Sequence, residues 1–215
     1  MESKLKFRDE LKSYVKKVLD VDLDRLPPTR QSKAMTRFYV ERVRRIFSPG
    51  LVPTEPEDFD ACLIDGADDC GVDFISRGDG EVLIIQAKYR GYGVNEKLGD
   101  ITEFCEVLGR IHPDIGKKYK KNYKLMEAVG DIDWDNDTFQ LVFISLGRLG
   151  PNLRTKEEEG PTLGPALMDL RDRCELTLCE ESDLNVELRE AISAGEMITE
   201  PVSVTFLPNE EGSPG

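Results

Sequence analysis

The segment that decides the fold reads Gly66-Ala67-Asp68-Asp69-Cys70-Gly71-Val72-Asp73-Phe74-Ile75, then Arg77-Gly78-Asp79-Gly80, then Glu81-Val82-Leu83-Ile84-Ile85-Gln86-Ala87-Lys88-Tyr89. Its middle part, two glycines around an aspartate, suits the positive φ angles of a tight turn and predicts a β-hairpin. The last part contains a run of consecutive apolar and β-branched residues. Such a run indicates a strand in the centre of a sheet, buried on both faces.

Three polar side chains are expected to meet at one end of this hairpin. Gln86 and Lys88 are two residues apart, so they share one face of the strand. A buried lysine needs a carboxylate nearby, and Asp73 on the first arm is the candidate. Asp and Gln oxygens are hard ligands that suit Mg²⁺, which takes few protein ligands and keeps several waters. We therefore expect Asp73 and Gln86 to bind Mg²⁺, which Mn²⁺ can replace, and Lys88 to orient the attacking water.

An ordinary hairpin is the alternative interpretation of the same residues. In that case Asp69 and Asp73 are turn caps, and Lys88 extends its ammonium group to solvent. The aspartate-rich turn, the buried strand and the Gln-x-Lys ending occur together at hairpin spacing. That combination favours the metal-site interpretation over the ordinary one.

The same residues resemble a known nuclease motif. Gly71-Val72-Asp73 followed by Gln86-Ala87-Lys88 is similar to the Gln-x-Lys variant of the PD-(D/E)xK motif of Mrr-type restriction enzymes. The greatest likeness is to the N-terminal nuclease region of abortive-infection phage-resistance proteins. The resemblance implies a restriction-endonuclease-like fold and metal-dependent cleavage of nucleic acid in antiviral defence. One departure is Gln86 in place of an acid, which leaves Asp73 as the carboxylate of the motif.

The resemblance has two further implications. Related nucleases place a metal-site glutamate on a helix before the sheet, and Glu41 is the candidate by position. The alternative for Glu41 is a surface pair with Arg44 or Arg45. Phage-resistance proteins of this kind are usually longer, so the chain is expected to be a nuclease domain from a larger protein.

The net charge of −13 is distributed unevenly along the chain. Residues 1–47 carry 13 basic and 7 acidic side chains, whereas residues 131–215 carry 6 basic and 19 acidic ones. Salt screens charges over about 10 Å, so local clusters matter more to a phosphate than the total charge. A basic run with two tyrosines predicts a nucleic-acid contact through Lys117, Lys118, Lys120 and Lys121. The alternative for this run is a solvated helix face.

Composition excludes several other classes of protein. The five cysteines form no Cys-x-x-Cys pair, and His112 is the lone histidine, so a zinc site and a Ser-His-Asp triad are disfavoured. His112 itself is expected at a helix end, before Pro113. No apolar stretch approaches the ~20 residues of a membrane span, and the N-terminus lacks a signal-peptide core. Cysteines that stay reduced, together with the lack of a membrane span and of a signal-peptide core, predict a cytoplasmic protein with no membrane partner.

Strands that alternate with helices after the hairpin predict a mixed α/β sheet with helices on both faces, preceded by N-terminal helices. A single domain over residues 1–207 is expected, with N-terminal helices in 1–47, an α/β core in 59–207 and a polar tail in 208–215. Expected helices cover residues 7–19, 31–46, 94–111, 115–129, 165–173 and 184–194. Expected strands outside the hairpin cover 59–64, 139–146, 175–179 and 202–207, and a loop covers 150–164.

These inferences predict a Mg²⁺-dependent endonuclease with Asp73, Gln86, Lys88 and Glu41 at its site. DNA is the favoured substrate. An RNA-cleaving enzyme with the same site is one alternative. A domain that keeps the hairpin as scaffold, and only binds nucleic acid or a protein partner, is the other. The sequence leaves open whether the chain forms a homodimer.

Overall fold

The computed structural model describes residues 5–64, 66–117 and 119–199. Within these ranges four strands form one mixed sheet in the order β1-β2-β3-β4. The strands are β1 (Phe74–Gly78), β2 (Glu81–Lys88), β3 (Thr138–Ser145) and β4 (Cys174–Cys179). β1 and β2 pair antiparallel, whereas β2, β3 and β4 are parallel to one another. The predicted mixed α/β architecture is therefore confirmed.

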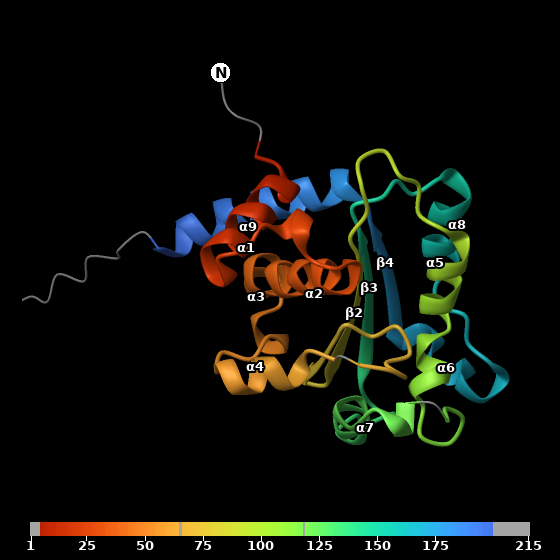
Figure 1. Ribbon diagram of the computed structural model, residues 1–215. Helices are drawn as coiled ribbons and strands as arrows, with labels where there is room; N and C mark the ends of the chain where they lie inside the picture. Colours follow the sequence, from red (N-terminus) through yellow and green to blue (C-terminus); the bar gives the residue numbers. More distant parts are fainter. Residues whose placement is uncertain (1–4, 65, 118, 200–215) are drawn as a thin grey trace, which may run out of the picture.

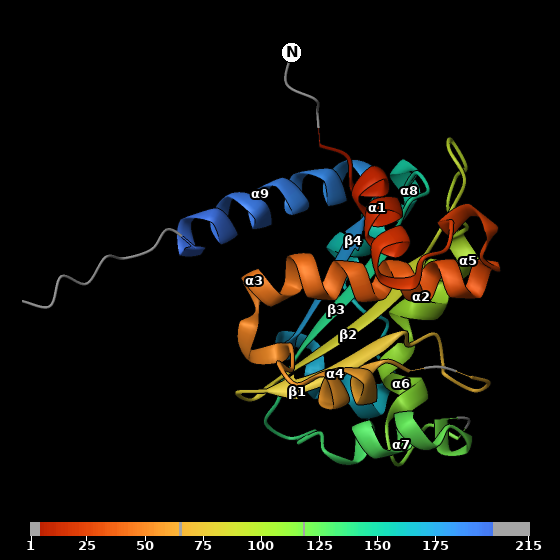
Figure 2. The same cartoon turned by 60° about the vertical axis from the view of Figure 1, so that its left-hand side comes forward.

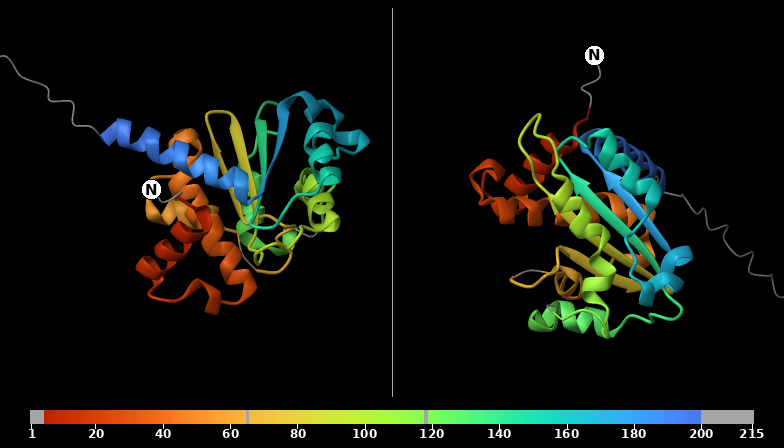
Figure 3. Two further views of the ribbon diagram at one scale, coloured as in Figure 1. Left: turned by 90° about the horizontal axis from the view of Figure 1, so that it is seen from above. Right: turned by 90° about the vertical axis from the view of Figure 1, so that its right-hand side faces the viewer.

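Helices cover both faces of the sheet (Figure 1). One face carries α1 (Phe7–Leu19), α2 (Pro28–Tyr39), α3 (Arg45–Phe47), α4 (Pro56–Cys62) and α9 (Glu181–Thr199). The other face carries α5 (Leu98–Cys105), α6 (Val107–Ile111), α7 (Tyr123–Gly130) and α8 (Pro151–Glu159). Figure 3 shows the two layers from above, and Figure 2 shows α2 crossing the sheet. Short 3₁₀ or π segments are η1 (Leu23–Arg25), η2 (Val40–Arg44), η3 (Pro49–Leu51), η4 (Tyr119–Lys121) and η5 (Pro165–Arg173).

Strand β2 contributes side chains to two separate cores. Val82 and Ile84 pack in the cluster that contains α5, α6 and α7. Leu83, Ile85 and Ala87 pack in the cluster that contains α1, α2 and α9. Every residue from 82 to 87 is buried, as the apolar run predicted. Because side chains alternate, Gln86 and Lys88 continue the row of Val82 and Ile84.

The hairpin turn has the conformation that its residues predicted. Asp79 and Gly80 have φ angles of 53° and 77°, and Gly78 pairs with Glu81 across the turn. Two positive φ angles in succession are the signature of a type I′ turn, which matches the twist of the flanking strands. The turn thereby fixes the register that continues to the polar end of the hairpin.

The strand predicted over residues 59–64 is wrong for most of its length. Residues 56–62 form helix α4, and Leu63 makes an isolated antiparallel bridge to Phe74. Pro56 occupies the first helical turn, and Glu57 and Asp58 follow it. Proline at that position and acids near the helix N-terminus both favour a helix start, and this signal outweighed the apolar pattern.

Two further regions differ from the sequence-based expectation. Residues 151–159 form α8 rather than a loop, because Pro151 begins a helix that Gly160 terminates with a φ of 73°. The helix predicted over 115–129 is interrupted: η4 covers 119–121, and Asn122 caps α7 by accepting from Leu125 N. The strand predicted over 202–207 and the tail lie outside the described residues. His112 follows the end of α6, as predicted.

Arg8 on α1 connects four segments of the chain. Its side chain is 2% exposed, and its Nε and Nη2 each lie 3.0 Å from the Glu181 carboxylate at the start of α9. Its Nη1 donates to Arg90 O after β2, and its Nη2 donates to Leu146 O after β3. Since a buried guanidinium needs all these acceptors, Arg8 fixes the N-terminal helix against the carboxyl ends of two strands.

Replacing Arg8 should therefore destabilise the fold. We expect Arg8→Met to lower the free energy of unfolding by about 3–5 kcal/mol, because Glu181 loses its buried partner and two carbonyls lose their donor. Lys12→Met is the matched control, since Lys12 pairs with Asp24 at an exposed position and such pairs contribute less than about 1 kcal/mol. Urea denaturation measures both changes. Equal losses in the two variants would contradict this account.

Candidate functional site

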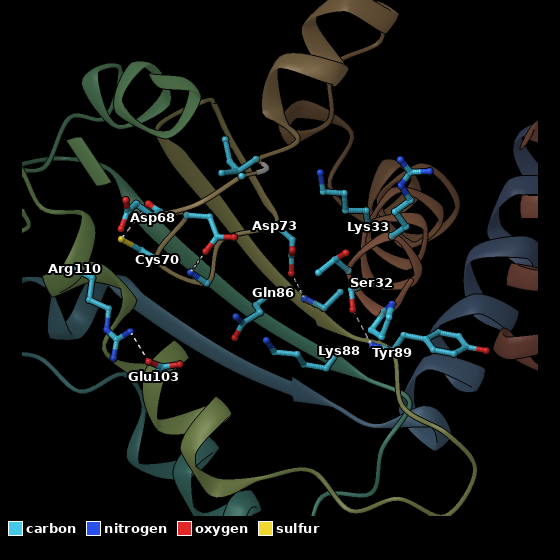
Figure 4. Close-up of a pocket in the computed structure, with 18 of the residues that line it drawn as sticks. Ser32, Lys33, Asp68, Cys70, Asp73, Gln86, Lys88, Tyr89, Glu103 and Arg110 are labelled. Carbon is cyan, nitrogen blue, oxygen red and sulfur yellow. Dashed lines mark hydrogen bonds and ion pairs between the residues drawn. The ribbon is translucent and has the colours of Figure 1, made fainter. Parts of the chain in front are cut away.

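A pocket of about 1190 Å³ opens beside the end of β2 (Figure 4). Asp73, Gln86 and Lys88 line it together, so the structure brings three of the four predicted catalytic residues to one cavity. The start of α2 forms one side, and α5 and α6 form another. The 66–71 loop and residues 115–117 complete the lining.

Gln86 occupies the most enclosed position in this group. Gln86 is only 5% exposed. Its side-chain oxygen, Oε1, is buried and has no hydrogen-bond partner among the described residues. A buried carbonyl oxygen without a donor costs about 1–3 kcal/mol, so native structures rarely keep one. An amide oxygen left unpaired inside a polar cavity is suited to accept from a ligand or to coordinate a cation.

Gly71 lets the Gln86 side chain lie against the neighbouring loop. Its φ angle is +81°, and a Cβ atom added there would lie 2.6 Å from Gln86 Nε2. Asp69 Oδ1 accepts from Gly71 N at 2.8 Å and holds this turn in place. The Asp-x-Gly spacing of the motif therefore serves two purposes: it supplies the left-handed conformation, and it leaves room for the glutamine.

Asp73 lies at the start of the hairpin, opposite Gln86. Its N–H donates to Ile85 O at 2.9 Å, and continuing the β1–β2 register by one step pairs Asp73 with Gln86. Directly opposed residues project to the same face of a sheet. One carboxylate oxygen, Oδ2, accepts from Ala87 N at 2.7 Å and takes the place of a backbone acceptor at the sheet edge.

Burial raises the pKa of Asp73 to about 6. The Ala87 N–H and the charges of Lys88 and Lys33 lower it, while Asp69 raises it further. The carboxyl group is thus held in an environment that disfavours its charge, and a cation bound beside it would relieve that cost. Near neutral pH the group is ionised and able to act as a ligand.

Lys88 does not form the direct ion pair with Asp73 that the sequence predicted. No Asp73 oxygen is a salt-bridge partner of Lys88, although the lysine charge acts on the Asp73 pKa. The side chain is partly buried and points along the same side of β2 as Gln86 (Figure 4). Its ammonium group has no hydrogen-bond partner among the described residues, so it remains available to a water or a phosphate in the pocket.

Two residues of α2 that the sequence reasoning missed also line the pocket. Ser32 Oγ accepts from Tyr89 N at 3.2 Å and anchors the strand end that carries Lys88. Lys33 stands close enough to Asp73 to lower its pKa. Arg110 and Glu103, from α6 and α5, form an ion pair on the opposite side of the pocket. Only tertiary packing brings these residues together, and no local motif signals it.

Glu41 does not line this pocket. Its carboxylate accepts from Tyr14 Oη at 2.6 Å and from Arg37 Nε at 3.0 Å. The surface pairing expected as its alternative is also different, because the partner is Arg37 rather than Arg44 or Arg45. These contacts tie α1 to α2 and give Glu41 a structural role, so we leave it out of the candidate metal ligands.

The four lysines predicted to contact nucleic acid do not all lie at the pocket. Lys117 is exposed and lines the pocket. Lys120 and Lys121 are exposed in η4, and neither lines the pocket. Lys118 lies outside the described residues. The basic run therefore does not form the continuous helix face that was the alternative, and Lys117 is the member placed to meet a ligand at the site.

The residues present fit a magnesium ion better than a metal that needs many protein ligands. Among the described residues, no group of three or more His, Cys, Asp and Glu side chains could hold a metal. Asp73 and Gln86 offer one carboxylate and one unpaired amide oxygen on one face. Mg²⁺ is commonly held by one or two carboxylates and completes its shell with water and phosphate oxygens.

Comparison with known proteins gives no relative from which a function could be transferred. No protein-family model matches the chain, and no curated protein or solved structure matches it. Among the described residues, no helix combines the length and apolar character needed to cross a bilayer. The site must therefore be interpreted from its own geometry.

Gly71→Ala tests the role of the turn. We expect it to lower Mg²⁺ affinity by about tenfold, because the added methyl group collides with the Gln86 amide and moves the proposed ligand oxygen out of position. Gly80→Ala is the matched control, since its φ is +77° and an added Cβ meets nothing within 4 Å. Both variants should lose about 1–2 kcal/mol of stability from the left-handed conformation. Calorimetric titration with Mg²⁺ separates them, and unchanged affinity in Gly71→Ala would refute this role.

Asp73→Asn tests the electrostatic cost of the carboxylate. A folded-state pKa of about 6 lies above the unfolded value, so stability is highest with the group protonated and falls as pH rises through 6. Asp73→Asn should therefore be more stable than the parent by about 3 kcal/mol at pH 7.5, and by little at pH 4. Added Mg²⁺ should stabilise the parent at pH 7.5 but not the variant. Urea denaturation measures both proteins. A difference in stability between parent and variant that does not change with pH would show that the Asp73 carboxylate is not its cause.

Proposed function

We propose that the protein is a metal-dependent nuclease that hydrolyses phosphodiester bonds in nucleic acid, with a restriction-endonuclease-like core. The observation that carries the proposal is the unpartnered, buried Oε1 of Gln86, which lines one pocket with Asp73 and Lys88. An acidic oxygen, an amide oxygen and an uncommitted ammonium group at one end of the hairpin are the groups that metal-assisted hydrolysis of a phosphodiester requires.

Each residue has a distinct role in this proposal. Asp73 and Gln86 would hold Mg²⁺ through their oxygens, and the ion would supply an acidified water and charge neutralisation at the phosphate. Lys88 would donate to the attacking water or to the scissile phosphate, and would stabilise the charge that develops there. Ser32 would keep the end of β2 in place through Tyr89 N. Protonation of Asp73 below about pH 6 would weaken metal binding.

The order of elements supports the same class of nuclease. A helix precedes an antiparallel hairpin, crossover helices follow, and a parallel strand then pairs with the second arm of the hairpin. The hairpin carries the site residues, as the resemblance to phage-resistance nucleases implies. We propose a role in bacterial antiviral defence on that resemblance, with DNA as the favoured substrate and RNA as the alternative.

Incubation with plasmid, single-stranded DNA and RNA tests the proposed activity directly. We expect cleavage with Mg²⁺ or Mn²⁺ and none with EDTA. Lys88→Met should reduce the cleavage rate by about 10²–10³-fold while Mg²⁺ affinity stays near the parent value, because both proposed ligand oxygens remain.

Glu41→Gln is the matched control for Lys88→Met. It changes a carboxylate outside the pocket, so it should affect stability rather than the rate. If Lys88→Met cleaves as fast as the parent protein, then the hairpin is only a scaffold. In that outcome the domain is a binding module rather than an enzyme.

A further inference from the structure

We infer that the strand bound in this pocket is single-stranded nucleic acid rather than a duplex. The inference rests on the proposed function and narrows its substrate class. It follows from three features of the pocket: the depth of its floor, the distribution of charge around it, and an exposed apolar side chain on its rim.

The proposed metal ligands lie at the floor of a recess. Gln86 is only 5% exposed, and Asp73 is partly buried. The first turns of α2 stand on one side of them, and α5 and α6 stand on the other (Figure 4), while residues 115–117 also belong to the lining. A duplex holds each phosphate on a broad, stiff cylinder, whereas a flexible single strand can bend its backbone into the recess.

Cationic side chains from separate segments of the chain line this recess. Arg30 is exposed at the start of α2, and Lys117 is exposed in the segment that follows α6. Neither has a salt-bridge partner among the described residues, and Lys88 lines the same pocket from β2. Three cations along one cavity can follow a single phosphate backbone.

The protein surface around the pocket opposes a wider polyanion. The chain has a net charge of −13; Asp68, Asp69 and Glu103 line the pocket, and Asp114 is exposed next to its 115–117 segment. A duplex carries twice the charge per length of one of its strands and covers a larger area. The cations that line the pocket serve the strand inside it, so a second strand outside would meet the negative charge of the protein, and this repulsion favours one strand.

The rim offers a contact that an unpaired base can use. Ile115 lines the pocket and is 42% exposed, so its aliphatic side chain is open to a ligand there. Apolar side chains stack against the face of a base only when that base is not stacked in a helix. A duplex would leave Ile115 in water, whereas a single strand could cover it.

Fluorescence anisotropy in EDTA measures binding without cleavage. Three labelled probes share one sequence of about 15 nucleotides that cannot pair with itself. They are the single-stranded DNA, the single-stranded RNA and the DNA duplex. At about 0.1 M salt we expect a single strand to bind at least about tenfold more tightly than the duplex. The DNA and RNA arms then identify which polymer the site prefers.

Charge variants connect the binding preference to the pocket. Arg30→Gln and Lys117→Gln should each weaken single-strand binding and reduce the slope of log K against log salt by about 0.7. Lys17→Gln is the matched control, because Lys17 is exposed on α1 and does not line the pocket. Ile115→Ser should weaken single-strand binding without changing the salt slope.

The outcomes separate this inference from the proposed function. Equal or tighter binding of the duplex, or no binding of any strand, would overturn the inference. Cleavage of duplex plasmid alone would overturn it too, yet would leave the nuclease proposal intact. Preferential binding of a single strand with no cleavage in Mg²⁺ or Mn²⁺ would support the inference and refute the nuclease.

Discussion

Strand β2 is hydrogen-bonded along both edges and buried on both faces, and the rest of the structure depends on this constraint. Its register with β1 and β3 leaves no freedom to slip, because a shift by one residue would exchange the two cores. The polar pair Gln86 and Lys88 must then leave the sheet on the face of Val82 and Ile84. Asp73 joins them because the type I′ turn fixes which residue lies opposite Gln86.

The site residues reduce stability, and the surrounding structure offsets that cost. Gln86 keeps a buried oxygen that accepts from no donor among the described residues. Burial also raises the pKa of the Asp73 carboxyl group to about 6. Such strain persists only where neighbouring elements determine the geometry. Two hydrophobic cores enclose β2, and Arg8 fastens the helical layer to the strand ends. The polar end of the hairpin is thereby held in one arrangement before any ligand binds.

Local sequence signals predicted the hairpin, β3, β4 and the convergence of Asp73, Gln86 and Lys88. They succeeded because turn chemistry and alternation act over a few residues. They failed at residues 56–62, part of which was predicted as a strand, and at 151–159, predicted as a loop, although a proline begins a helix in each segment. They could not find Ser32 or Lys33, because nothing near those residues indicates that α2 begins beside the end of β2.

The position of Glu41 follows from the geometry of that same helix. Lys33 lies in the first turns of α2, whereas Glu41 follows eight residues later in the π-helical segment η2. At 1.5 Å per residue this is about 12 Å along the axis, too far for both side chains to reach one small site. The end of α2 that does reach the pocket carries cations and the positive end of the helix dipole. A helix oriented in this way favours an anion beside the proposed metal ligands, which is the charge that a phosphate backbone brings.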